Sequence, residues 1–230
     1  KSISFDADYF TFDSENSRDF FTEEYNNSGN LQATNSAALN ISNQAIENFS
    51  AKIDIAFPLE KVNLSYGIKT SFTNTKSDVL YYNTISGSAV LDPNRSNEFK
   101  YQENVLAGYI SGDTSINNRL EIQFGLRLEN TKTKGIHAEM RQETINNYTK
   151  LFPSIYFSFA KNDANNFGFS YGRRINRPNF GHLNPFRFYI NDKSYSVGNP
   201  FLRPSFSDNI EFSHLYKKNL NTSIFLNIIT

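Results

Sequence analysis

The chain has 230 residues, in which 23 lysines and arginines balance 23 acidic residues, with 13 tyrosines, 22 phenylalanines, no tryptophan and no cysteine. Neutral charge without a basic cluster excludes a nucleic-acid partner, because such binding rests on many phosphate contacts. The absence of cysteine excludes disulfide bonds and cysteine-based zinc sites. No stretch approaches the roughly 18 consecutive apolar residues of a membrane-spanning helix.

Alternating apolar and polar residues predict strands along almost the whole chain. After a weakly alternating segment at 2–12, residues 49–57 and 62–72 alternate clearly and predict a hairpin around the short turn 58–61. Residues 120–129 have one wholly apolar face and a second face with three charges. The remaining predicted strands, which bring the total to about nine, are 101–111, 151–160, 166–174, 208–216 and 222–229.

The predicted connections alternate between short and long. The short ones are 58–61, 112–118, 161–165 and 217–221. The long ones, rich in Asn, Ser, Thr, Gly and Pro, are 13–47, 73–100, 130–150 and 175–206. This alternation predicts an antiparallel meander that has all its long loops at one end.

Two architectures fit a meander with one apolar face. A soluble sandwich packs its apolar faces together and commonly has strands of about five or six residues. A transmembrane barrel turns its apolar face to lipid and needs about 9 to 11 residues for each tilted strand. Strands of about nine to thirteen residues, charges in mid-strand, and aromatic residues near strand ends favour the barrel. Aromatic residues of this kind are Phe49, Phe57, Tyr66, Phe72 and Tyr109.

Four segments carry a resemblance to a known family. SVGNPFLRPSFSDNIEFSHLY (196–216) resembles the segment that leads from a long extracellular loop into a barrel strand in TonB-dependent outer-membrane receptors. SYGRRINRPNFGHLNPF (170–186) is similar to a segment of the Bacteroidetes branch of that family, and so are VLDPNRSNEFKYQENVLAGYI (90–110) and IQFGLRLENTKTKG (122–135). The matches occur in the expected order over most of residues 49–216.

The resemblance implies a bacterial outer-membrane barrel of about 22 strands. At roughly 26 residues per strand such a wall needs about 550 residues or more, so we expect residues 1–230 to be a partial barrel domain without a plug domain. The implied function is a segment of a TonB-dependent receptor that takes up a scarce or large solute, such as an iron chelate, glycan, cobalamin or peptide. The alternative is a soluble or surface-exposed β-sandwich binding module, such as an adhesin or carbohydrate binder.

The resemblance also implies a set of partners. They are outer-membrane lipid, the inner-membrane TonB complex acting through a plug that this chain lacks, the solute, and a surface lipoprotein lid. We expect no cofactor and no catalysis, because no catalytic constellation supports a barrel-embedded hydrolase. The histidines His137, His182 and His214 are scattered without metal-ligand spacing, which predicts ordinary loop or strand residues and no metal site.

The stretch RRINRPNFGHLNPF (173–186) and the residues that follow it form the candidate ligand site in the implied extracellular loop. Prolines stiffen this loop by forcing the preceding residues toward extended backbone. Arginines there can meet an anionic or hydrogen-bonding ligand, and aromatic rings can stack on a sugar or chelate. The candidates are Arg173, Arg174, Arg177, Phe180, Phe186, Phe188 and Tyr189. In the structural alternative the arginines pair with lumen carboxylates such as Glu121, Glu129 or Glu211, and the aromatic residues pack the loop shut.

Overall fold

The protein consists almost entirely of β-strands. The computed structural model describes residues 1–138, 141–191 and 194–230. Among these residues, no helix is long and apolar enough to span a membrane. The elements in chain order are β1 (Ser2–Tyr25), β2 (Leu31–Pro58), β3 (Asn63–Asn83), β4 (Val90–Leu91), β5 (Asn97–Ile116), β6 (Leu120–His137), β7 (Gln142–Asn162), β8 (Asn165–Asn176), α1 (Phe180–Leu183), β9 (Phe188–Tyr189), β10 (Tyr195–Ser196), β11 (Ser205–Tyr216) and β12 (Leu220–Ile229).

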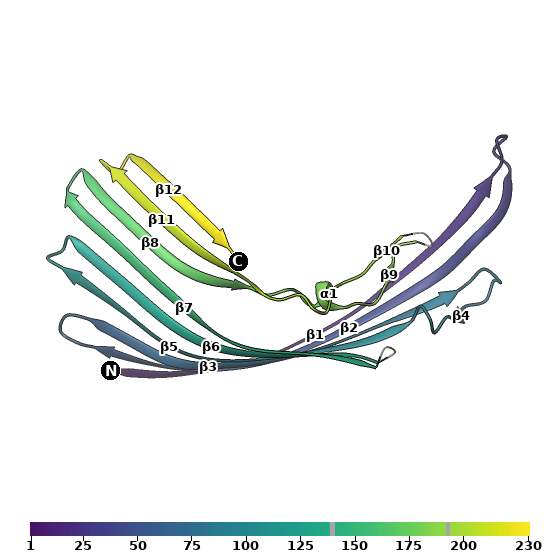
Figure 1. Cartoon of the computed structure of the whole chain (residues 1–230), viewed down its shortest axis with the longest axis horizontal. Coiled ribbons are helices and arrows are strands. Elements are labelled where there is room, and N and C mark those ends of the chain that lie inside the picture. The colour runs from purple at the N-terminus through teal and green to yellow at the C-terminus, as the bar shows by residue number, and fades with distance from the viewer. Residues whose placement is uncertain (139–140, 192–193) are drawn as a thin grey trace.

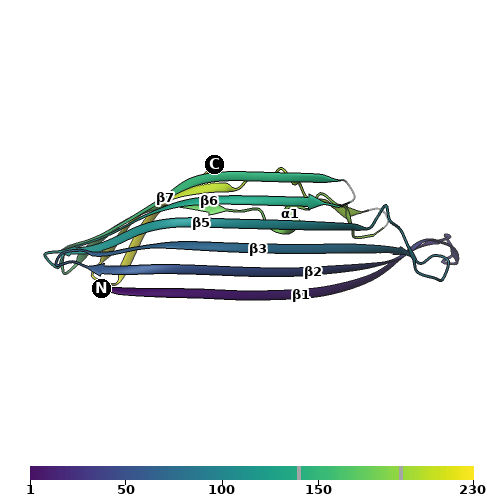
Figure 2. The same cartoon turned by 90° about the horizontal axis from the view of Figure 1, so that it is seen from below.

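Nine long strands form one antiparallel meander in the order β1-β2-β3-β5-β6-β7-β8-β11-β12, with β4 paired to β3. The sheet is curved into a trough with β1 and β12 at its edges (Figure 1), and its strands run side by side when seen from below (Figure 2). The other sheet in the described chain is the two-stranded β9–β10 pair. The predicted meander is confirmed. The sandwich alternative is wrong, because no second sheet of described residues covers the apolar face.

The strands are longer than predicted, because three expected loops mostly continue them. β1 and β2 span 24 and 28 residues and meet at a tight turn, where Gly29 donates a hydrogen bond to the carbonyl of Asn26. β6 and β7 likewise extend through most of residues 130–150. Both faces of these extensions are mostly polar, with isolated apolar residues such as Phe99 and Tyr81, so they lack the regular period-two signal of a half-buried strand. The corrected stretches are 13–47, 73–100 and 130–150.

The tight turns at the opposite end use residues that tolerate a left-handed backbone. Asn117 and Asn118 join β5 to β6 with φ of 54° and 52°, and Lys217 and Lys218 join β11 to β12 with φ of 47° and 59°. Two consecutive residues of positive φ are typical of a type I′ turn, whose twist matches that of the flanking strands. These connections are short, as the sequence predicts.

An apolar belt covers the convex face of the trough near the short turns. It consists of the alternate side chains that point away from the trough, such as Phe5, Ile53, Ile68, Leu126 and Leu128. These side chains remain 43% to 67% exposed, because no element of the described chain covers them. On β6 the belt runs from residue 120 to 128, close to the length that a tilted barrel strand needs to cross a bilayer.

The small buried core lies on the opposite, concave face. It includes Phe99 and Ala107 of β5, Tyr81 of β3 and Leu183 of α1, each 6% exposed or less. These residues are buried where the connection between β8 and β11 lies against the sheet (Figure 1). Packing in this protein is therefore concentrated around one long connection.

Candidate functional site

The connection between β8 and β11 folds back over the concave face instead of extending beyond the strand ends (Figure 1). We call its described parts, residues 177–191 and 194–204, the strap. Each proline in the strap fixes its own φ and pushes the preceding residue toward extended backbone, so little freedom is lost when the strap docks. The four prolines are Pro178, Pro185, Pro200 and Pro204.

Two Asn-Pro-Phe triplets set the internal turns of the strap. The side-chain oxygen of Asn184 accepts a hydrogen bond from the backbone N–H of Phe186 at 3.1 Å, and that of Asn199 accepts from Phe201 at 2.9 Å. Each hydrogen bond pairs the backbone N–H of the phenylalanine that follows a proline. The proline itself has no N–H. The two turns are joined, because Gly198 donates to the carbonyl of Asn184 at 2.8 Å.

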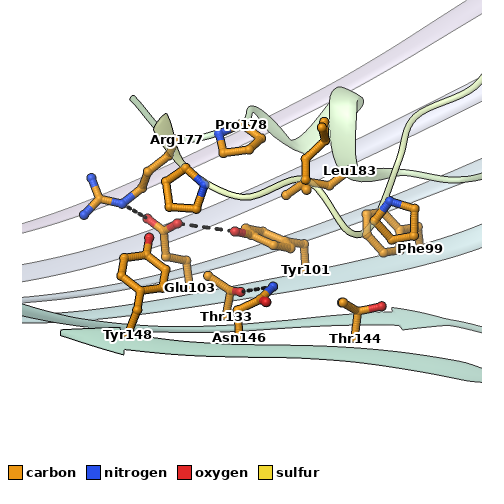
Figure 3. A pocket seen from close by; sticks show the side chains of 14 residues that line it. Phe99, Tyr101, Glu103, Thr133, Thr144, Asn146, Tyr148, Arg177, Pro178 and Leu183 are labelled. Carbon is orange, nitrogen blue, oxygen red and sulfur yellow. Dashed lines mark hydrogen bonds and ion pairs between the residues drawn. The ribbon is translucent and has the colours of Figure 1, made fainter. Parts of the chain in front are cut away.

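Arg177 anchors the start of the strap to carboxylates on β5 and β6. Its Nη2 donates to a carboxylate oxygen of Glu129. Its Nε lies 3.9 Å from Glu103 (Figure 3). Arg127 donates to the other oxygen of Glu129 at 2.6 Å, and the Thr131 hydroxyl lies 3.3 Å from the oxygen that Arg177 contacts. Only 5% of the Glu129 side chain is exposed, so guanidinium groups rather than water stabilise its charge.

An aromatic stack holds the strap one turn further along. The ring of Phe180 in α1 lies 5.0 Å from that of Phe99, which in turn stacks on His137 at 4.3 Å. His137 is buried, and neither of its ring nitrogens has a hydrogen-bond partner among the described residues. Burial lowers the pKa of His137, so the neutral imidazole is the form that suits this stack.

The far part of the strap reaches the strands near the opposite edge of the trough. Tyr189 of β9 packs edge-on against Tyr81 of β3 at 5.6 Å, and Arg95 lies 5.0 Å from both rings. Arg95 also donates to the Tyr81 hydroxyl at 2.8 Å. The Phe188 ring lies 5.8 Å from the guanidinium of Arg18 on β1. The strap therefore spans the concave face from β6 to β1.

A small cavity of about 30 Å³ remains between the strap and the wall (Figure 3). Tyr101, Tyr148 and Thr144 line it from the wall, and Arg177 lines it from the strap. The Tyr101 hydroxyl donates to Glu103 at 3.3 Å, and burial raises the pKa of Tyr101. A cavity of this size has room for about one or two water molecules. It does not fit a large solute while the strap is docked.

A larger open groove lies on the concave face toward the short turns. Its volume is about 750 Å³, and its side chains are mostly small and polar, with charges at Asp113, Arg173, Arg174 and Glu211. The neutral polar side chains that line it are Asn63, Ser65, Ser111, Gln123, Ser154, Ser170 and Asn209. Such a surface suits a hydrated lumen or a polar protein segment rather than lipid.

The structure separates the predicted arginines. Arg177 pairs with Glu129, as the structural alternative predicts. Arg173 lies 3.9 Å from Asp208 and 5.4 Å from the ring of Phe206, and both Arg173 and Arg174 line the open groove. Of the other carboxylates proposed as partners, Glu211 lines the groove and Glu121 is exposed.

The aromatic candidates divide in a similar way. Phe180, Phe188 and Tyr189 contact the wall, whereas Phe186 is half-buried within the strap. These contacts fit the structural alternative, in which the aromatic residues pack the loop shut. Direct ligand contact by any of the seven candidates stays a prediction.

The sequence did not point to the wall residues that receive the strap. These residues lie in three segments that are distant along the chain from the strap, and nothing in their spacing relates them to it: Arg18, Tyr81, and Arg95, Phe99 and Glu103. The sequence feature that could have indicated these residues is a charged or aromatic side chain on the strand face opposite the apolar belt. Only the register of the sheet shows which of these residues face the same part of the trough.

The three histidines lie in different parts of the structure. His137 stacks on Phe99, the backbone of His182 takes part in α1, and His214 stacks on Phe167 at 4.5 Å. No group of three potential metal ligands gathers in the described parts of the chain.

Comparison with known proteins extends over the whole chain. The model of a family described as "Outer membrane protein beta-barrel family" matches residues 1–230. No curated protein matches the chain. Several solved structures match the chain.

The copper transporter OprC is similar with a TM-score of 0.65 and 11% identity, over 96% of this chain and 35% of that one. The unliganded ferric citrate transporter FecA has a TM-score of 0.57 and 13% identity, over 98% and 32%. The ferric yersiniabactin uptake receptor FyuA from Yersinia pestis has 0.53 and 11%, over 96% and 33%. The chain thus spans about a third of the length of these proteins, and the likeness is one of fold.

Proposed function

Because the chain belongs to the outer membrane protein beta-barrel family over residues 1–230, we propose that it forms wall, lumen and outer loops of a TonB-dependent receptor in the bacterial outer membrane. The receptor takes up a solute too large or too scarce for simple diffusion. The similar structures are named for copper, ferric citrate and ferric yersiniabactin, which supports a metal chelate ahead of a glycan, cobalamin or peptide. The resemblance of the loop motifs supports the Bacteroidetes branch of these receptors.

The proposal assigns residues 1–230 to one part of the barrel domain, without a plug. Length supports this assignment, because the chain covers 32% to 35% of the three receptors and transporters described above. Outer-membrane lipid contacts the apolar belt. The plug, through which the inner-membrane TonB complex supplies energy, and a surface lipoprotein lid are partners outside this chain.

The observation that carries the proposal is the docked strap. It lies across the concave face on contacts at both ends, with Arg177 against Glu129 and Tyr189 against Tyr81. A solute that moves through the lumen has to pass it. Displacement of the strap exposes guanidinium and aromatic groups to the lumen, which makes Arg177 and Phe180 ligand contacts of the open state. The strap then acts as a gate.

A reversible crosslink tests this gating role. We would replace Phe99 and Phe180, whose rings lie 5.0 Å apart, with cysteines in the natural full-length chain and join them with a short bis-thiosulfonate reagent. Uptake of radioactive iron supplied as ferric citrate, and as other chelates, would be measured in cells before and after reduction. We expect the crosslink to reduce uptake at least tenfold and the reductant to restore it.

A second cysteine pair, joined by the same reagent but located away from the strap, serves as the control. Asn130 and Thr149 lie opposite each other on the convex face, with the Asn130 amide 2.9 Å from the Thr149 hydroxyl, on strands that are already paired, so their crosslink should leave uptake unchanged. Full uptake by the protein crosslinked at Phe99 and Phe180 would refute the gate. Failure of the unmodified protein to transport any offered solute would refute the receptor proposal itself.

A further inference from the structure

The convex face changes character beyond the apolar belt, toward the long loops. The cross-strand row at the end of the belt consists of Ile53, Ile68, Gly108, Leu128 and Leu151. Two rows further, the same face presents Phe49, Phe72, Asn104, Lys132 and Asn147. The next row consists of Glu47, Asn74, Gln102, Lys134 and Ile145. An aromatic, amide and lysine surface thus follows the lipid-facing surface directly.

A groove of about 320 Å³ opens in this surface over β2, β3 and β5. Phe49 and Phe72 form one side of it, with rings stacked at 6.5 Å. The other side presents the amides of Asn74, Gln102 and Asn104. An amide both donates and accepts hydrogen bonds, as sugar hydroxyls do, and an aromatic face suits the apolar face of a sugar ring.

Two lysines border the amide side of the groove. Lys132 pairs across the sheet with Asn104, and Lys134 pairs with Gln102. Lys134 makes an exposed ion pair with Glu143 at 3.0 Å, and Lys132 has no carboxylate within ion-pair distance among the described residues. Exposed pairs of this kind contribute little, so both ammonium groups are available to a phosphate.

This surface lies just beyond the headgroup region of a simple phospholipid, at the height of a larger sugar headgroup. Lys132 follows the last belt residue of β6, Leu128, by four residues, which is ~13 Å along the strand and ~10 Å along the membrane normal at a tilt near 40°. The headgroup region extends about 5 to 8 Å beyond the hydrocarbon core of a typical bilayer. A headgroup made of sugars reaches further outward than a simple phosphodiester.

We propose that this surface binds the phosphorylated sugar headgroup of a glycolipid in the outer leaflet. The sugar ring lies against Phe49 and Phe72, its hydroxyls bond to the amides of Asn74 and Asn104, and its phosphate lies between Lys132 and Lys134. The lipid chains continue onto the apolar belt below. This site depends on the outer-membrane location of the family and is independent of the solute that the receptor carries.

Native mass spectrometry of the natural full-length chain in detergent micelles tests the site. The probes are a diphosphorylated diglucosamine lipid (lipid A), the same lipid without its phosphates, and phosphatidylglycerol. We expect lipid A to bind more tightly than the other two. The double variant Lys132→Gln with Lys134→Gln should bind lipid A roughly 25-fold more weakly, about fivefold for each lysine.

The matched control is Lys150→Gln, which removes the same charge from a lysine near Phe206 on the concave-face register. It should leave lipid A binding unchanged. Replacement of Asn74 and Asn104 with alanine should weaken both phosphorylated and dephosphorylated sugar lipids. Equal binding of phosphatidylglycerol and lipid A, or equal losses in the convex and concave lysine variants, would overturn the proposal. Circular dichroism melting of each variant checks that it is folded.

Discussion

The six longest strands, β1, β2, β3, β5, β6 and β7, each consist of two halves with different environments. Near the short turns, one face carries the apolar belt and the other a polar surface, as in the segment of β6 from Leu120 to Leu128. Beyond Leu128 the same strand continues with Asn130, Lys132 and Lys134 on its convex face. The first half is specified by lipid. The second half lies beyond the apolar belt and depends on backbone pairing and on the strap.

This difference shows where side-chain contacts contribute to the stability of the sheet. In the belt, contact with the hydrocarbon core selects the residue at every second position, and a single charge is unfavourable there. In the extensions, the selective contacts are few and lie on the concave face. They centre on Glu129, Phe99 and Tyr81, which the strap covers. Substitutions should therefore be harmful almost everywhere in the belt and at only a few places beyond it.

A charge in the belt should have the largest effect. Leu126→Arg places a guanidinium group on the lipid-facing side of β6, and we expect a loss of ~2–4 kcal/mol in the free energy of unfolding in lipid vesicles. Urea titration of the full-length chain measures it. Ile145→Arg is the control, because Ile145 is 66% exposed on the convex face of β7 beyond the belt. A similar loss in both variants would contradict the division into two halves.

Loss of the buried carboxylate should have the next largest effect. Glu129→Gln leaves Arg127 and Arg177 facing a neutral amide, and we expect ~1–3 kcal/mol of lost stability, below the value for a fully buried pair because 27% of Arg177 is exposed. Hydrogen exchange of the strap amides reports whether the loss is local. Glu143→Gln breaks only the exposed pair with Lys134 and should change stability by less than ~1 kcal/mol. An unchanged strap in Glu129→Gln would show that the ion cluster does not anchor it.

A methyl group inside the strap should act locally. A Cβ built at Gly198 meets backbone carbonyls of Asn184, His182 and Gly181 at 2.5 to 2.8 Å, so Gly198→Ala forces the backbone apart. We expect faster exchange throughout the strap and a loss of ~1–3 kcal/mol, the range for overpacking. Gly181→Ala is the matched control, because its nearest contact is at 3.5 Å. Equal exchange rates in the two variants would refute the close packing at Gly198.

A lower pH should weaken docking of the strap, with the smallest effect of the four changes. The folded-state pKa of His137 lies below its ordinary value of 6.5, because burial disfavours the imidazolium ion. The unfolded state then binds more protons, so docking is at full strength above pH 6.5 and weakens as the pH falls below it. Limited proteolysis of the strap between pH 7.5 and 5 measures this trend. His137→Phe should abolish the part that comes from His137, and an identical pH profile in that variant would exclude this residue as the cause.

The period-two pattern determined the strands, their antiparallel order and the short turns. It did so because lipid on one face and water on the other impose an alternating sequence, as in residues 49–57 and 120–129. The same reasoning failed for residues 13–47, where both faces are mostly polar and the regular alternation disappears although the backbone stays extended. The sequence also supplied the strap's candidate residues and one correct partner, Glu129.

Only the tertiary structure decided where the strap lies and which residues receive it. Arg177 and Glu103 are far apart along the chain, and the curvature of the sheet brings them together on its concave face. His137 became a buried, stacked ring for the same reason, since Phe99 lies opposite it on the neighbouring strand. Local sequence sets the direction of each side chain relative to its own strand. Contacts across a trough depend on register and curvature, which arise from all the strands at once.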